Sequence, residues 1–170
     1  LAPGYRAELV ASEPMVQCPI FFEFDPDGRI WCIEYQGYMR DVKGSGEAEP
    51  ICRVVVLEDT DHDGRADKST VFLDRLVMPR TVAIVKGGAL VADERRLVFA
   101  ADTDGDLKAD ETTVIDAGYG SGGNAEHSPN GMLRALDNWF YNAKSAARYR
   151  LISGDWRKEK TEFRGQYGIC

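Results

Sequence analysis

The sequence predicts an all-β fold, a partial β-propeller of about three four-stranded antiparallel blades. Three observations support this prediction. One segment of the chain recurs 43 residues later, pairs of short apolar runs joined by turn residues recur along the chain, and no segment of useful length has a helical period. A repeat of about 40–45 residues with several short strands in each unit is typical of propeller blades.

The repeat is clearest in two segments, residues 53–71 and 96–114. Aligned at a constant offset of 43, they share arginine, valine, aspartate, threonine and alanine at equivalent positions. Each unit also contains a hairpin, in which an apolar strand is followed by a tight turn and a second apolar strand. The turns hold residue types that tolerate the positive φ of tight hairpins, at Asp27-Gly28, Gly87-Gly88 and Asp137-Asn138.

We therefore expect four strands in each unit. In the first unit they lie at about residues 20–25, 29–35, 51–58 and 69–74. In the second unit they lie at about residues 81–85, 89–92, 95–101 and 112–116. In the third unit they lie at about residues 131–136, 139–143, 147–152 and 161–164. The blades then span about residues 20–74, 81–116 and 131–170.

The expected domain is residues 1–170, the N-terminal part of one propeller. Three blades cannot close a ring, and closure is how these folds remove exposed sheet edges. The chain also stops within an aromatic, glycine-rich stretch, residues 163–168. We expect a fragment of a longer ring, and a self-contained open β-sheet protein is the alternative.

Composition argues against several classes of function. The net charge is −7, and an acidic protein gains little from a phosphate backbone, so nucleic acid is not an expected partner. No apolar run approaches the ~18 residues of a membrane helix, so no membrane span is expected. The four cysteines form no C-x-x-C motif. Cys32 and Cys52 lie on segments expected to pair, where they form either a disulfide or two buried free thiols.

Acidic residues are concentrated in two short segments, 59–67 and 102–110, which hold eight of the 28. Crowding like charges costs energy unless a cation neutralises them. In the first segment the pattern D-x-D-x-D-G-x-x-D places carboxylates at Asp59, Asp61, Asp63 and Asp67. Alternate positions put carboxylates on one side of a turn, Gly64 permits the bend, and Arg65 can offer its carbonyl. This is the oxygen-rich cage that Ca²⁺ prefers.

The first loop matches the first nine positions of an EF-hand, but Thr70 stands where the bidentate glutamate belongs, and strands flank the loop. It is therefore predicted as a calcium loop within a hairpin, with a solvated Asp-rich turn as the alternative. The second loop carries its carboxylates at Asp102, Asp104, Asp106 and Asp110. Lys108 takes the place of Arg65, while Leu107 replaces the bend glycine and makes the bend less favoured. Both loops join outer strands, so we expect structural calcium away from any pocket.

Three segments fall on the opposite face, at the mouth of the ring: residues 36–50, 75–80 and 117–130. Long loops on a rigid scaffold often carry function. His127 lies just before an innermost strand, near the rim of the central channel. A neutral imidazole there can take a proton from a substrate hydroxyl, or it can hydrogen-bond the loop into shape. Ser128 has no acyl-transfer triad order, and the glycine run lacks Gly-Lys-Ser/Thr, so neither a serine hydrolase nor a phosphate loop is expected.

Four segments together resemble one family: Phe24–Glu34, Val56–Phe72, Glu126–Gly131 and Asp137–Tyr141. The chain resembles the membrane-bound dehydrogenases of planctomycete and verrucomicrobial type, which are named by similarity. These are propellers similar to the quinoprotein glucose/sorbosone dehydrogenases. The resemblance spans nearly the whole chain and implies a six-bladed ring in a periplasmic or secreted protein. The chain begins at Leu1 without a leader, so either a signal peptide has been removed or the chain is a fragment.

The resemblance also implies chemistry with pyrroloquinoline quinone (PQQ). His127 matches the general base that removes a proton from a sugar or alcohol hydroxyl while hydride passes to the quinone. Arg40, Arg80 and Arg134 are candidate anchors for the quinone carboxylates, or surface ion-pair partners. A downstream c-type cytochrome is the implied electron acceptor. The alternative function is a non-catalytic, calcium-stabilised propeller that binds a polysaccharide or a protein.

Overall fold

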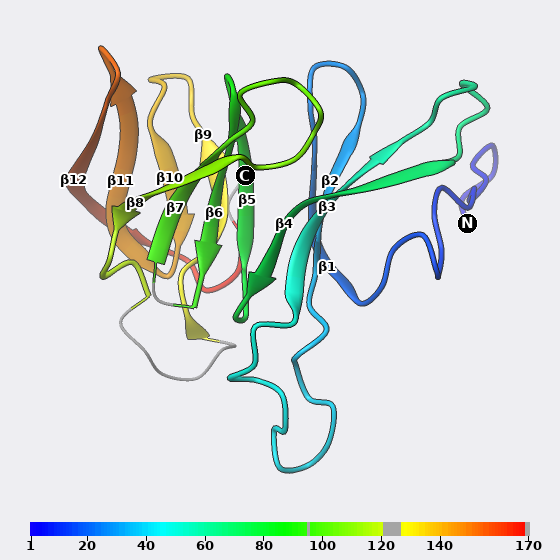
Figure 1. Cartoon of the computed structure of the whole chain (residues 1–170), viewed down its shortest axis with the longest axis horizontal. Coiled ribbons are helices and arrows are strands. Elements are labelled where there is room, and N and C mark those ends of the chain that lie inside the picture. Colours follow the sequence, from blue (N-terminus) through cyan, green and yellow to red (C-terminus); the bar gives the residue numbers. More distant parts are fainter. Residues whose placement is uncertain (95, 121–126, 169–170) are drawn as a thin grey trace.

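The computed structural model describes residues 1–94, 96–120 and 127–168, and it confirms the all-β, partial-propeller prediction. Sheet 1 contains β1 (Pro19–Phe24), β2 (Ile30–Glu34), β3 (Cys52–Glu58) and β4 (Lys68–Leu76). Sheet 2 contains β5 (Thr81–Val85), β6 (Gly88–Asp93), β7 (Arg96–Ala101) and β8 (Glu111–Asp116). Sheet 3 contains β9 (Asn130–Arg134), β10 (Phe140–Ala143), β11 (Ser145–Ile152) and β12 (Asp155–Arg164). Each sheet is an antiparallel meander in chain order, and the three sheets lie side by side (Figure 1).

The strand bounds agree closely with the sequence prediction except in the last strand. β12 begins at Asp155, whereas the sequence predicted a start at 161. Ser153 and Gly154 have φ of 50° and 91°, the conformation of a two-residue hairpin turn, so the chain passes from β11 directly into β12. The Ser-Gly dipeptide was the available signal for this turn.

The sheets pack face to face through two apolar clusters. Between sheets 1 and 2, Ile33 and Val54 meet Val82 and Val91, all of them fully buried. Between sheets 2 and 3, the cluster contains Leu90, Leu97, Phe140 and Tyr149. Burying each of these side chains contributes about 1.5–3 kcal/mol. Because sheet 2 is covered on both faces, its central strands are apolar on both faces rather than alternating.

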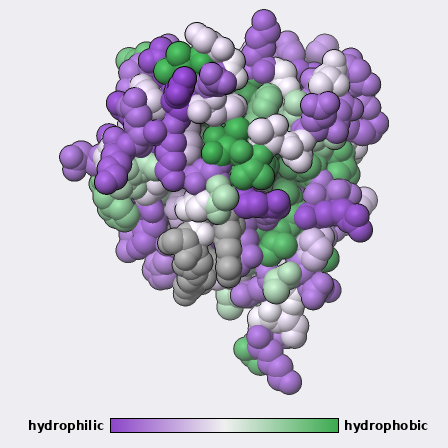
Figure 2. Space-filling model, turned by 60° about the vertical axis from the view of Figure 1, so that its left-hand side comes forward, coloured by the Kyte–Doolittle hydropathy of each residue, from purple (hydrophilic) through white to green (hydrophobic). Residues whose placement is uncertain are grey.

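Sheet 3 is less completely covered. Leu133, Leu151 and Phe163 are exposed at 38%, 46% and 60% respectively. Figure 2 shows apolar surface among polar side chains on the side of the molecule that holds sheet 3 in Figure 1. The contrast with sheet 2 shows that the packing partner of a sheet, not its own sequence pattern alone, decides how much apolar surface it buries.

Each Asp-rich loop contacts the element that precedes its sheet. In loop 102–110 the amide of Ala109 donates to the Phe72 carbonyl of β4 at 2.8 Å. At the equivalent position of loop 59–67, the amide of Ala66 donates to the Val10 carbonyl, also at 2.8 Å. Val16 and its neighbours cover one face of sheet 1. The segment before β1 therefore stands beside sheet 1 as β4 stands beside sheet 2.

The two ends of the sheets differ in their loops. Loops 59–67 and 102–110 lie at the same end as the β1–β2 turn, which we call the turn end, and the segment 36–50 projects from the other, the mouth end (Figure 1). This is the arrangement predicted from the strand order. Residues 121–126 of the third mouth-end segment, with Glu126 among them, lie outside the described residues, as do residues 169–170.

Cys32 and Cys52 are free and buried. They pack on opposite faces of sheet 1, because Cys32 belongs to the cluster with Val16 and Cys52 to the cluster shared with sheet 2. Of the two readings left open by the sequence, the structure shows free thiols. Burial raises the pKa of the Cys32 thiol to about 11. Among the described residues no helix is long and apolar enough to cross a membrane.

Candidate functional site

A pocket of about 330 Å³ opens at the mouth end, where the three sheets meet. The walls come from the start of β1, the segment after β2, the residue before β5 and the start of β9. The side chains that line it are mostly aromatic or apolar, with one charged residue: Phe21, Tyr35, Tyr38, Arg80, Asn130 and Tyr167. A concave, largely apolar site with a few polar groups is typical of a small-molecule pocket.

Arg80 supplies the charge of this mouth-end pocket and is only 7% exposed. Its Nη2 donates to the Glu94 carbonyl oxygen at 2.8 Å, whereas its Nε has no hydrogen-bond partner among the described residues. Within the described part of the chain, no carboxylate forms an ion pair with it. A buried cation without a carboxylate pays an uncompensated desolvation cost. An anionic ligand in the pocket would offset that cost.

Two tyrosines stand beside Arg80. The rings of Tyr35 and Tyr38 lie 5.4 Å apart at an interplanar angle of 42°. Burial raises the pKa of Tyr35 to about 12, although the charge of Arg80 and a hydrogen bond to it act in the opposite direction. The Tyr35 phenol is therefore neutral at physiological pH. A cation flanked by aromatic rings suits a planar anion.

Asn130 ties the C-terminal residues to this pocket. Its Nδ2 donates to the carbonyl oxygens of Ser128 at 3.0 Å and Gln166 at 2.9 Å, and its Oδ1 accepts from the Gly168 amide at 2.8 Å. These bonds hold Tyr167 at the pocket wall. The sequence placed Asn130 in a mouth-end segment but gave no sign that Tyr167 lies at the pocket, because a contact across 36 residues leaves no local pattern.

The predicted anion anchors do not come together. Arg80 lines the mouth-end pocket, but Arg40 is exposed in the segment 36–50, where its side chain lies against Gly46. Arg134 is exposed at the turn end, where its Nη2 donates to Asn138 Oδ1 at 2.8 Å. His127 is exposed and shortly precedes Asn130 along the chain, at the mouth end as predicted, without lining the described pocket.

Both Asp-rich loops bring carboxylates together. Three carboxylate oxygens in each loop lie within 4.8 Å of one another, a spacing at which they can hold a metal ion. The two groups are Asp59, Asp61 and Asp67 in the first loop, and Asp102, Asp104 and Asp106 in the second. Asp63 and Asp110 lie outside these groups, and each accepts a backbone hydrogen bond, from Arg65 and Thr103 respectively. The carbonyls of Arg65 and Lys108 stay predicted ligands.

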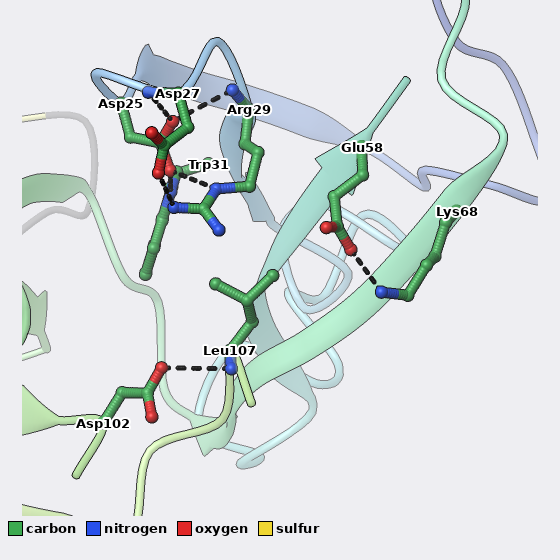
Figure 3. A network of polar contacts seen from close by, with 8 residues as sticks. All are labelled: Asp25, Asp27, Arg29, Trp31, Glu58, Lys68, Asp102 and Leu107. Atoms are coloured by element: carbon green, nitrogen blue, oxygen red, sulfur yellow. Dashed lines mark hydrogen bonds and ion pairs between the residues drawn. The ribbon is translucent and has the colours of Figure 1, made fainter. Parts of the chain in front are cut away.

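The second loop makes the same bend as the first, although Leu107 replaces the bend glycine. His62 and Gly64 have φ of 61° and 89°, and the equivalent Gly105 and Leu107 have 86° and 65°. A left-handed leucine costs about 1–2 kcal/mol, but Leu107 is buried in the cluster with Trp31, which offsets that cost. Figure 3 shows its side chain pointing toward Trp31 while its amide donates to Asp102 Oδ2 at 3.0 Å.

The loops differ in one charge contact. In the second loop the Nζ of Lys108 lies 2.8 Å from Asp106 Oδ2, and the hydrogen bond and charge of Asp106 raise the pKa of Lys108. A metal ion at Asp106 would have to displace this ammonium group. In the first loop the equivalent residue, Arg65, forms no ion pair with a described carboxylate. The first loop is therefore the better candidate for a cation site of the two.

The family model of a domain of unknown function, DUF7133, matches residues 1–167. The chain belongs to the DUF7133 family. No curated protein matches it. A solved X-ray structure of a protein provisionally assigned as a gluconolactonase aligns with 88% of this DUF7133 chain at a TM-score of 0.53 and 16% identity. This chain spans about half the length of that protein, covering 50% of it, and the likeness supports the propeller fold alone.

A second cavity of this DUF7133 chain, about 810 Å³ in volume, lies at the turn end. Asp102, Gly105 and Leu107 of the second loop line it, and Arg65 and Ala66 of the first loop line a separate cavity of about 360 Å³, so the expectation that both Asp-rich loops lie away from any pocket was wrong. For the second loop, the physical reason is that the hairpin turns of neighbouring sheets converge at the turn end. Loop 102–110 closes one side of the space between these turns.

Glu23 of β1 also lines the turn-end cavity. Its Oε2 is shielded from solvent and has no hydrogen-bond partner among the described residues. Burial raises the pKa of Glu23 from its ordinary value near 4.5 to about 7, although a backbone hydrogen bond from Ile84 acts against this. Sequence reasoning missed Glu23, because its isolation depends on the neighbouring sheet.

Replacing Glu23 with glutamine is expected to remove a pH dependence of stability. The folded-state pKa exceeds the unfolded value, so the native state gains protons relative to the unfolded state, and the resulting stability is lost as pH rises from about 4.5 through about 7. Allowing for solvent screening, the free energy of unfolding falls by about 1 kcal/mol over this pH range. Urea denaturation at pH 5 and pH 8 measures it. Glu162→Gln, at an exposed position, is the control and should keep the wild-type dependence of unfolding free energy on pH. If Glu23→Gln also kept that dependence, Glu23 would not be its source.

Proposed function

We propose that this chain is part of a quinoprotein oxidoreductase that oxidises a sugar or alcohol hydroxyl, with PQQ as cofactor and Ca²⁺ as a structural metal. The observation that carries the proposal is the mouth-end pocket, where Arg80 is buried without a carboxylate partner in the described part of the chain. The pocket lies at the same end as His127, the candidate base.

The residues present fit a planar, carboxylate-bearing quinone. Arg80 lines the pocket and offers its guanidinium to one carboxylate, and Tyr35 and Tyr38 supply aromatic faces beside it. When bound, the quinone supplies the hydride acceptor. The chain's own contribution is to orient the ligand, to exclude water with the aromatic wall, and to take the hydroxyl proton at the unprotonated ring nitrogen of His127.

Calcium has a separate role in this proposal. The loops join β3 to β4 and β7 to β8, so a bound ion would fix outer strands and not contact the quinone. Exposed loops with three carboxylates suit the millimolar calcium of extracellular compartments. The proposal accordingly includes a periplasmic or secreted protein, with a c-type cytochrome as electron acceptor.

Calorimetric titration of the purified protein with PQQ in calcium buffer tests the cofactor, followed by a turnover assay with aldoses and alcohols and an artificial electron acceptor. His127→Ala should keep the PQQ affinity and lower turnover about 10²–10⁴-fold, as expected for loss of a general base. His62→Ala, in the first Asp-rich loop, is the matched control and should retain turnover. The absence of saturable PQQ binding would refute the proposal.

A further inference from the structure

The turn-end cavity is built from equivalent parts of all three sheets. Its walls are the β1–β2 turn, the β5–β6 turn, loop 102–110 and the β9–β10 hairpin. With about 810 Å³ it is more than twice as large as the mouth-end pocket. It lies at the opposite end of the sheets from Arg80, so any ligand here is independent of the proposed quinone site.

One wall of the turn-end cavity is fixed before any ligand arrives. Asp25 Oδ2 accepts from the Nε of Arg29 at 2.6 Å and from the indole of Trp31 at 3.0 Å, and Arg29 also pairs with Asp27 at 2.6 Å (Figure 3). These charges satisfy one another and hold the β1–β2 turn rigid. They are therefore not the groups that would recognise a ligand.

Three other groups at the turn-end cavity are left with unused capacity. Glu23 has a shielded Oε2 without a partner among the described residues. Lys86, exposed in the β5–β6 turn, and Arg134 form no ion pair in the described part of the chain. Asp102 also lines the cavity, but its two oxygens accept the amides of Gly105 and Leu107, so the two cations without ion pairs remain the groups that can bind an anion.

The remaining lining of this cavity includes exposed aromatic side chains. Phe24 is 60% exposed at its edge, and Phe140 lies behind the Arg134 guanidinium at 6.0 Å. Aromatic faces pack against the C–H faces of sugar rings, a carboxyl accepts from or donates to hydroxyls, and cations bind carboxylates. Together these groups match a ring that carries both hydroxyls and a carboxylate.

We infer that the turn-end cavity binds an acidic sugar unit, a uronic acid of a polysaccharide. Its carboxylate lies between Lys86 and Arg134, and its hydroxyls meet Glu23, whose carboxyl rotates to bring the shielded Oε2 into the cavity. This site goes beyond the proposed oxidoreductase activity and does not depend on it. It gives the chain a surface that would hold the protein on an acidic polysaccharide while the mouth end stays open.

Calorimetric titration with trigalacturonate and with neutral galactotriose tests the inference. Both titrations are run in EDTA, so that calcium cannot bridge sugar and protein, and circular dichroism confirms that the sheets stay folded. We expect saturable binding of trigalacturonate and at least tenfold weaker binding of galactotriose. Lys86→Ala should weaken trigalacturonate about tenfold, the effect of one lost charge contact. Lys43→Ala, in the exposed mouth-end segment 36–50, should leave it unchanged.

Each other outcome counts against the site. Equal affinity for the two sugars would overturn the acidic class, and equal losses in Lys86→Ala and Lys43→Ala would reduce the binding to general charge attraction. No binding in folded protein would overturn the inference outright. Arg80→Met, at the mouth end, should bind trigalacturonate like wild type, so failure of the quinone proposal and failure of this one give different results.

Discussion

Replacing Arg80 with methionine is expected to lower the affinity for PQQ at least 30-fold and to leave the free energy of unfolding unchanged or raised. The guanidinium is 7% exposed, and its Nε has no partner in the described part of the chain. Losing a desolvated contact to a ligand carboxylate costs about 2–5 kcal/mol of binding free energy, which corresponds to a 30-fold loss or more.

The stability of Arg80→Met should move in the other direction, because an unpaired buried charge opposes folding. An apolar residue of similar volume removes that desolvation cost, by about 0–2 kcal/mol, after allowing for the lost hydrogen bonds to the Glu94 carbonyl and to Tyr35. A residue that weakens folding yet strengthens ligand binding is typical of a functional site. Calorimetric titration and urea denaturation measure the two effects.

Arg53→Met is the matched control. Arg53 pairs with Glu34, whose side chain is fully buried, so removing the arginine leaves a buried carboxylate without its ion partner. We expect a loss of about 2–4 kcal/mol in stability and no change in PQQ affinity. The assignment of Arg80 fails if Arg80→Met is destabilised like Arg53→Met and still binds PQQ like wild type.

Saturating calcium is expected to stabilise the chain substantially. A ligand at 100 times its dissociation constant adds about 2.7 kcal/mol per site, and two sites add about twice that. For a chain of 170 residues, each kcal/mol raises Tm by about 2–4 °C, so the total shift is on the order of 10–20 °C. Differential scanning calorimetry in calcium and in EDTA measures the shift.

Variants separate the two calcium loops. Asp59→Asn and Asp102→Asn should each remove one part of the shift, with the larger part lost from the first loop, since Lys108 competes for Asp106 in the second. Lys108→Ala should strengthen calcium binding by the second loop. Asp155→Asn, at an exposed carboxylate at the start of β12, should behave like wild type. Equal Tm values in calcium and EDTA would rule out both sites.

Most of the fold could be predicted because its signals are local. Turn residues such as Asp27-Gly28 and Asp137-Asn138 mark the hairpins, and the offset of 43 marks the repeat. The bend at Leu107 was judged less favoured because local propensity penalises a left-handed leucine. The packing of that side chain under Trp31 belongs to the neighbouring sheet and is invisible in a single repeat.

The candidate sites were predictable only where one short segment supplies the chemistry. The carboxylate groups of the Asp-rich loops could be predicted because the members of each group lie within one short loop. Arg80 could be named, but its lack of a carboxylate partner among the described residues and its separation from Arg40 and Arg134 depend on how three sheets meet. Glu23 gave no signal at all, since an acidic residue in an alternating strand usually faces water.

The hydrogen bonds from Ala66 to Val10 and from Ala109 to Phe72 make each Asp-rich loop a coupling element between neighbours. An array of stacked units unfolds in one transition only while the contacts between units outweigh the differences in their own stabilities. A calcium ion that orders loop 102–110 would hold Ala109 against β4, and its release would free sheets 1 and 2 to melt separately. The ion concentration would then set the cooperativity of unfolding as well as its midpoint.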